Sequence, residues 1–512
     1  MYFGYSLSNS ISQQKWTKVY EETLILADKL DLADWCKFYY KGIRAYAYRK
    51  VKEQTEKDFG KEKRIWLACA DYKYLSYGEY FRLERKIQTK KYDKNAGPGI
   101  LGVIGDYTNI SSKEFEDQTW TYSREIWGGG YLNRILAILC YMESRLKEKM
   151  FIYGDISKDN LKTAISLLNR NLEKPVELPA RCDYSRLYNI VRTIGIPEEE
   201  KILLMENAYL GNIDLKYRIF IEEHFDAKII NTFWKNRFKD YDIKSDKFEK
   251  VLRAYLSYGF DLKDLFSYIP LKKTKEEYLL LLELIIKIEN TKNRISRIFG
   301  ITKDLKDNTI RGFSWEFRYS LFGHEAEDFS THFTFDDYVN ELSKCFGKYI
   351  DIKSFLEEKI KVEDENAFKS KLQEYRLQNS YYLFKGEDKY DIVFPQDLES
   401  YKAGDKIAPY LLDQIKVAAK KNKKRLNDKK FKEIASKETT EQIYELIDIY
   451  HHFPARDVDW YYAIDYFHSH SDALERYYPL FHMNFEYFSS TEHIARALFI
   501  NDEFYEFCKG LY

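Results

Sequence analysis

The chain has 512 residues, and its 82 basic side chains equal its 82 acidic ones in number. A net charge of zero excludes the broad positive field that concentrates nucleic acids or anionic membranes around a protein. At roughly 100–200 residues per domain, a chain of this length forms two to four domains. Its most distinctive feature is an aromatic content of 45 Tyr and 34 Phe.

The cysteines and the N-terminus indicate a cytoplasmic protein. The Cys residues lie far apart and form no Cys-x-x-Cys pair, so we expect reduced thiols and neither a disulfide framework nor a zinc ribbon. The first residues, MYFGYSLSNS, lack the basic start and apolar core of a signal peptide. No apolar stretch is long enough to span a bilayer, so we expect no membrane association. The abundance of Lys, Ile, Tyr and Asn is typical of AT-rich bacterial genomes.

Residues 1–185 are predicted to form a mixed α/β domain. A short strand over residues 2–7 precedes a helix that Ser12 caps. The aromatic stretches 38–51 and 64–87 have β-forming composition and could pair as antiparallel strands. The glycines between residues 97 and 105 indicate a loop.

The second half of this region is predicted to be a helix, a strand and another helix. Gly128–Gly130 opens a helix that continues to Lys149, and a short strand over 150–153 follows. A helix that starts at Ser157 and an extended segment over 175–179 complete a unit of the size of a βαβ motif.

Residues 186–512 are predicted to form an α-helical domain, with splits near 290–330 and 386–408. No fixed repeat of 30–50 residues is present, so an irregular helical array is favoured over a solenoid. The predicted fold class is therefore α+β, in which an N-terminal mixed α/β region precedes a larger irregular α-helical region.

The first candidate site would bind a phosphate-bearing ligand. Gly128, Gly129 and Gly130 precede a helix whose N-terminal N–H groups could face a phosphate. Arg124 and Arg134 could neutralise its charge, and Asp155 could hold a metal or a ribose. Complete dinucleotide and P-loop fingerprints are absent, so the alternative is an ordinary loop that leads into a helix.

The second candidate is a metal site in the His-rich C-terminal region. Six of the nine His lie between residues 451 and 493, and His468, His470 and Asp472 are the candidate ligands for a metal-dependent hydrolase. His468 and His470 are two residues apart, so on a helix they point in different directions. Surface or hydrogen-bonded imidazoles are the favoured interpretation.

The third candidate is a basic run that includes Lys420, Lys421, Lys423, Lys424 and Arg425. It could bind nucleic acid or an acidic partner protein. The Lys residues lie on all sides of a predicted helix, and no aromatic side chain interleaves with them before Phe431. A solvated helix explains the same pattern, so nucleic-acid binding is not favoured.

These observations favour a binding protein over an enzyme. No complete catalytic or cofactor signature is present, so we expect no cofactor. Tyr supplies apolar area with a polar tip and is enriched at protein–protein contacts. The leading hypothesis is an intracellular bacterial protein that binds another protein, as an immunity or defence component does. The aromatic N-terminal strands and the aromatic C-terminal region, which includes Tyr461, are the expected contact regions.

Overall fold

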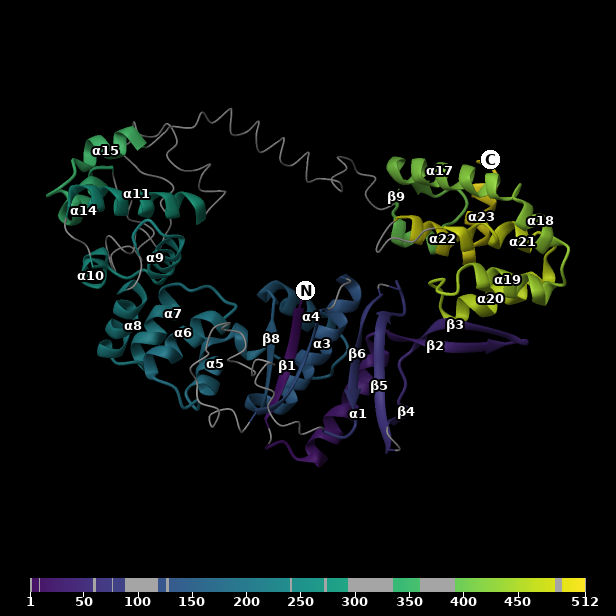
Figure 1. Ribbon diagram of the computed structural model, residues 1–512, viewed down its shortest axis with the longest axis horizontal. Coiled ribbons are helices and arrows are strands. Elements are labelled where there is room, and N and C mark those ends of the chain that lie inside the picture. The colour runs from purple at the N-terminus through teal and green to yellow at the C-terminus, as the bar shows by residue number, and fades with distance from the viewer. Residues whose placement is uncertain are drawn as a thin grey trace. The chain divides into compact units, whose positions relative to one another are not determined.

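Figure 1 shows a computed structural model of the chain. It describes residues 2–8, 10–58, 61–75, 77–87, 118–125, 129–239, 242–270, 274–292, 335–359, 392–483 and 490–511. The chain forms two compact units. The terminal unit combines Met1–Ala180 with Phe384–Tyr512, and the central unit comprises Arg181–Leu383. The two ends of the chain thus belong to the same unit.

The first sheet of the terminal unit has three antiparallel strands in the order β7-β1-β8. Its strands are β1 (Tyr2–Ser8), β7 (Gln118–Glu125) and β8 (Met150–Gly154). Phe3, Tyr5 and Leu7 of β1 are buried, as expected of a central strand. Three helices belong to this part of the unit: α1 (Gln13–Lys29), α3 (Gly129–Leu146) and α4 (Lys158–Asn169). Helix α3 contacts strands of both sheets of the unit, which explains why it is apolar over most of its surface.

The second sheet is also antiparallel and has five strands. They are β2 (Leu32–Tyr40), β3 (Ile43–Lys50), β4 (Gln54–Asp58), β5 (Lys61–Asp71) and β6 (Tyr77–Glu84). The long strand β5 pairs with β4 and β2 along one edge and with β6 along the other. Lys41 and Gly42 join β2 to β3 with φ angles of 43° and 83°. Positive φ at both loop residues is the requirement of a type I′ hairpin turn.

The C-terminal helices of the terminal unit pack on the β2–β3 hairpin (Figure 1). They are η6 (Pro395–Ser400), α17 (Pro409–Arg425), α18 (Lys429–Ala435), α19 (Thr439–Ile449), α20 (Asp457–Ser469), α21 (Ala473–Tyr477), η7 (Leu480–His482), α22 (Ser490–Ile500) and α23 (Asp502–Lys509). A short parallel pair, β9 (Ile392–Val393) with β10 (Lys406–Ile407), precedes α17. One apolar core joins Phe38, Ile43 and Ala45 of the hairpin to these helices.

The central unit is helical in its described residues. Its helices are α5 (Tyr184–Val191), α6 (Glu198–Ala208), α7 (Leu215–His224), α8 (Ala227–Lys239), α9 (Asp246–Tyr258), α10 (Leu262–Tyr268), α11 (Lys275–Lys292), α14 (Phe335–Phe346) and α15 (Ile352–Lys359). Trp234, Tyr255 and Tyr258 are almost completely buried, and Trp234 contacts both tyrosine rings edge to face. Many aromatic side chains of this unit therefore form its core.

The α+β fold class is confirmed, because two antiparallel sheets precede a mostly helical region. The βαβ-like unit predicted over residues 150–179 is wrong. Strand β8 pairs antiparallel with β1, and residues 175–179 form no strand. The side chain of Asn169 instead exchanges two hydrogen bonds with the backbone of Val176, at 2.9 and 3.0 Å, and so replaces a strand partner.

Candidate interaction surface

The β2–β3 hairpin has one buried and one outward face. Alternation along each strand puts Phe38 and Tyr40 on the face that packs against the C-terminal helices. Tyr461 of α20 lies between these two rings, with centroid distances of 5.0 Å to Phe38 and 4.6 Å to Tyr40, both edge to face. The two aromatic regions singled out in the sequence are thus brought together, and this contact fixes the hairpin on α20.

The free edge of β3 is covered by the segment that leads into α20. The N–H of Tyr48 donates to the carbonyl of Ala455 at 3.0 Å, and the indole N–H of Trp460 donates to the carbonyl of Tyr46 at 3.1 Å. At the turn, the hydroxyl of Tyr444 donates to the carbonyl of Gly42 at 2.7 Å. Because this edge is already paired, a partner is not expected to add a strand there.

The outward face of the hairpin is aromatic and cationic. Trp35 stacks on Tyr46 with ring centroids 5.9 Å apart, and Tyr46 is 42% exposed. Tyr39 is 67% exposed and lies opposite Arg44, while Lys37 lies opposite Tyr46. Among the described residues neither Lys37 nor Arg44 forms an ion pair, and both are exposed. We call these five residues the hairpin surface.

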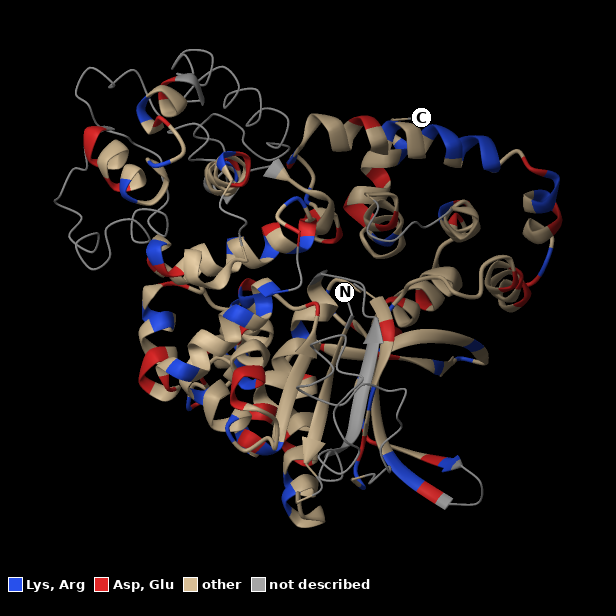
Figure 2. Ribbon diagram, turned by 60° about the vertical axis from the view of Figure 1, so that its left-hand side comes forward, with Lys and Arg blue, Asp and Glu red and all other residues tan. Residues whose placement is uncertain are grey.

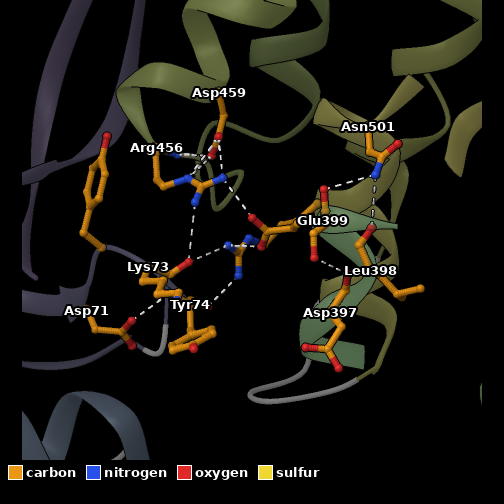
Figure 3. Close-up of polar contacts among 12 residues, drawn as sticks. Asp71, Lys73, Tyr74, Asp397, Leu398, Glu399, Arg456, Asp459 and Asn501 are labelled. Atoms are coloured by element: carbon orange, nitrogen blue, oxygen red, sulfur yellow. Dashed lines mark hydrogen bonds and ion pairs between the residues drawn. The ribbon is translucent and has the colours of Figure 1, made fainter. Parts of the chain in front are cut away.

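A buried ion network connects the second sheet to the helices behind the hairpin (Figure 3). Arg456 binds the carboxylates of Glu399 and Asp459 at 2.9 and 2.8 Å. Arg496 also binds Glu399, and it donates to the carbonyl of Tyr74 in the turn that follows β5. The positive charges of the two Arg side chains offset the negative charges of the two carboxylates. Both Arg side chains point toward hydrogen-bond acceptors of this chain. This arrangement indicates a structural role for the network, which connects the sheet to the helices.

Two cysteines of the second sheet, Cys36 in β2 and Cys69 in β5, have raised thiol pKa values. Burial, together with the neighbouring Asp34 carboxyl, raises the pKa of Cys36 to about 12. Burial likewise raises the pKa of Cys69 to about 12. Both thiols are therefore protonated at neutral pH, and a protonated thiol is a weak nucleophile.

The residues of the predicted phosphate site belong to different structural elements, and not all of them are among the described residues. Gly129 and Gly130 are the first residues of α3, while Gly128 lies outside the described residues. Asp155 is exposed after β8, and Arg124 lies in β7, where its side chain is not described. The phosphate site remains a prediction.

Arg134 is engaged with the protein itself. Its Nε donates to the carbonyl of Leu30 at 2.7 Å, and its Nη1 donates to the carbonyl of Gly130 at 2.9 Å. Its Nη2 lies 3.8 Å from the buried carboxylate of Asp71. The guanidinium thus joins the C-terminal end of α1 to α3 and β5.

The candidate metal ligands His468 and His470 lie at the end of α20, and Asp472 follows them. His470 stacks on Tyr466 with ring centroids 3.9 Å apart and shares a 2.8 Å hydrogen bond with Ser469. Asp472 accepts a hydrogen bond from the hydroxyl of Tyr466 at 3.2 Å. Across the part of the chain that the structure describes, no three His, Cys, Asp or Glu side chains are grouped so as to hold a metal.

The basic run occupies the C-terminal turns of α17 and the start of α18, visible as a blue stretch near the C-terminus in Figure 2. Lys420, Lys421, Lys423 and Lys424 are exposed. Arg425 is different, because its guanidinium donates to the carbonyls of Pro479 and His482 at 2.7 Å each. One of the five predicted basic residues thus fastens α17 to the segment that follows α21.

Trp35, Lys37 and Arg44 were not singled out from the sequence. The signal that could have identified them is the Lys41-Gly42 turn. A two-residue loop at that point fixes the register of β2 against β3, and the register places these side chains opposite the buried face.

No family model, curated protein or solved structure matches this chain. Within the described ranges, no helix combines the length and the apolar character needed to cross a membrane.

Proposed function

We propose that this chain binds a partner protein through the hairpin surface, and that the partner presents an acidic segment there. The observation that carries this proposal is the composition of the outward face, where exposed aromatic rings alternate with two cations that lack ion-pair partners among the described residues. Tyr and Trp provide large contact areas at a low entropic cost, and they dominate binding energy at protein interfaces. The cations select for carboxylates.

The biological setting that we propose is immunity or defence in a bacterial cell. Association with another protein is the physical activity that such a role requires, and it needs no catalytic group. The hairpin surface suits it because the packing of Phe38 and Tyr40 on α20 holds the backbone of the surface in place before a partner arrives.

The test begins with capture of proteins by the tagged full-length chain from cells of its source, followed by reconstitution with the purified partner. We expect the double variant Tyr39→Ala/Tyr46→Ala to raise the Kd about 100-fold, because exposed Tyr rings at an interface often supply a large share of the binding energy. The charge reversal Lys37→Glu/Arg44→Glu should slow association and invert its dependence on salt, because the new carboxylates repel the acidic segment and salt screens that repulsion. Isothermal titration and stopped-flow association measure the two effects.

Helix α1 provides matched controls, because Ile25 is 61% exposed and Lys18 is also exposed. Ile25→Ala and Lys18→Glu should bind like the wild type. A partner that binds the hairpin variants as tightly as the wild type would show that the surface is not the interface. Tight binding of single-stranded RNA or DNA that is lost in the same variants would reassign the surface to nucleic acid.

A further inference from the structure

A cavity of about 610 Å³ lies beside α17 and the first turns of α22. Its volume is within the range of pockets that bind small ligands, roughly 300–1,000 Å³. Its lining includes Asp413, Val417, Lys421, Asn422, His482 and Ile494. None of these residues belongs to the hairpin surface, so the cavity requires a separate explanation.

Two buried polar atoms in the cavity wall lack hydrogen-bond partners in the described part of the chain. Asn422 is only 4% exposed, and its Oδ1 accepts no hydrogen bond. The Nε2 of His482 is likewise unpaired. An unsatisfied buried polar group is energetically costly, so such groups at a cavity wall indicate positions where a ligand supplies the missing partner. Asn422 requires a donor, such as an N–H group.

The electrostatic environment of the cavity is positive. Lys421 is exposed and forms no ion pair in the regions described, whereas the one lining carboxylate, Asp413, lies 3.5 Å from Lys416. Burial and the nearby Arg425 and Lys430 lower the pKa of His482, which keeps its imidazole neutral at pH 7. Thr491 lies in the first turn of α22, where backbone N–H groups and the helix dipole favour an anion.

Aliphatic side chains form another part of the wall. Val417 is 55% exposed, while Ile494 and Met483 are buried. A ligand that fills the cavity must therefore combine an anionic group, N–H donors and a body that packs on aliphatic side chains.

We propose that this cavity binds a small organic anion with a nitrogen-containing ring, the chemical class of the nucleoside monophosphates. The anionic group would lie near Lys421 and the first turn of α22, and the ring would donate to Asn422 against Val417 and Ile494. Such a ligand matches the positive charge, the buried Asn422 acceptor and the aliphatic part of the wall, whereas an acidic peptide requires an open groove and no buried acceptor.

Titration calorimetry of the full-length chain with AMP, GMP, CMP and UMP tests this proposal. We expect at least one of them to bind, and its nucleoside and inorganic phosphate to bind at least tenfold more weakly, because each supplies only half of the contacts. Asn422→Leu should weaken binding about tenfold without loss of stability, because Leu has a similar volume and leaves no orphan acceptor. Lys421→Gln should weaken binding and reduce its dependence on salt.

Lys420→Gln is the matched control, because Lys420 is exposed on the same helix but does not line the cavity. It should bind like the wild type. The proposal is overturned if none of the four nucleotides binds at millimolar concentration, or if Asn422→Leu and Lys421→Gln bind as well as the wild type. Asn422-dependent binding of an acidic peptide in place of nucleotides would overturn it as well.

Discussion

At the scale of single residues, two neighbours in α22 have opposite effects on stability as pH changes. Burial raises the pKa of Glu492 to about 7, although Arg496 opposes the shift. Burial and Arg496 lower the pKa of His493 to about 4. Both groups are therefore neutral in the folded chain over a pH range in which they are charged in the unfolded chain.

The sign of each effect follows from proton linkage. The stabilising contribution of Glu492 is present below its unfolded pKa of about 4.5, and it is lost as pH rises through about 7. That of His493 is lost as pH falls from 6.5 through about 4. Between about pH 4.5 and 6.5, a rise in pH therefore decreases the stabilising contribution of Glu492 and increases that of His493.

Substitution of Glu492 by Gln should separate these effects. Gln cannot ionise, so E492Q should not lose stability as the wild type does when pH rises. From pH 5 to pH 8, the difference in the free energy of unfolding should therefore change in favour of E492Q by about 1–3 kcal/mol. Urea unfolding at several pH values measures this difference. H493Q serves as the control, because its difference from the wild type should change only below about pH 6.5. Parallel pH profiles for E492Q and the wild type would contradict the assignment.

At the scale of elements, the position of the hairpin depends on the ion network around Arg456. Replacement of Arg456 by Met leaves the nearly buried carboxylates of Glu399 and Asp459 without this cation. Removal of one partner from a buried network costs about 3–5 kcal/mol. We expect Arg456→Met to lower the free energy of unfolding by that amount, as measured with urea.

The exposed pair formed by Arg49 and Asp457 is a suitable comparison, because the Arg49 side chain is 44% exposed and lies 3.2 Å from the carboxylate. Arg49→Met should cost less than about 1 kcal/mol. Equal losses in the two variants would show that the network around Arg456 contributes no more than a surface ion pair does.

The same elements show how far sequence reasoning reaches. Aromatic, β-forming composition predicted strand structure over residues 38–51, and Gly128–Gly130 predicted the start of α3, because both signals are local. The contact of Phe38 with Tyr461 joins positions more than 400 residues apart, and no local pattern encodes it. The basic character of α17 could be predicted, but the engagement of Arg425 depends on the carbonyls of Pro479 and His482.

At the scale of the whole molecule, the terminal unit is assembled from two distant segments of the chain. The sequence predicted a division near residue 185, whereas the contacts group residues 384–512 with residues 1–180. Within that unit, the apolar face of the hairpin is covered by helices from the later segment. A fragment of residues 1–185 would expose this face, including Phe38 and Ile43.

We therefore expect the fragment of residues 1–185 to aggregate or to lack a cooperative unfolding transition, because a large exposed apolar patch favours association. Co-expression with residues 384–512 should restore a soluble complex. Residues 181–383 should fold alone, since the aromatic core around Trp234 and Tyr255 lies within them. Size-exclusion chromatography and urea unfolding distinguish the outcomes. A monomeric 1–185 fragment that unfolds cooperatively would mean that the sheets form a domain without the helices, and the hairpin surface would then be carried by a separately folding module.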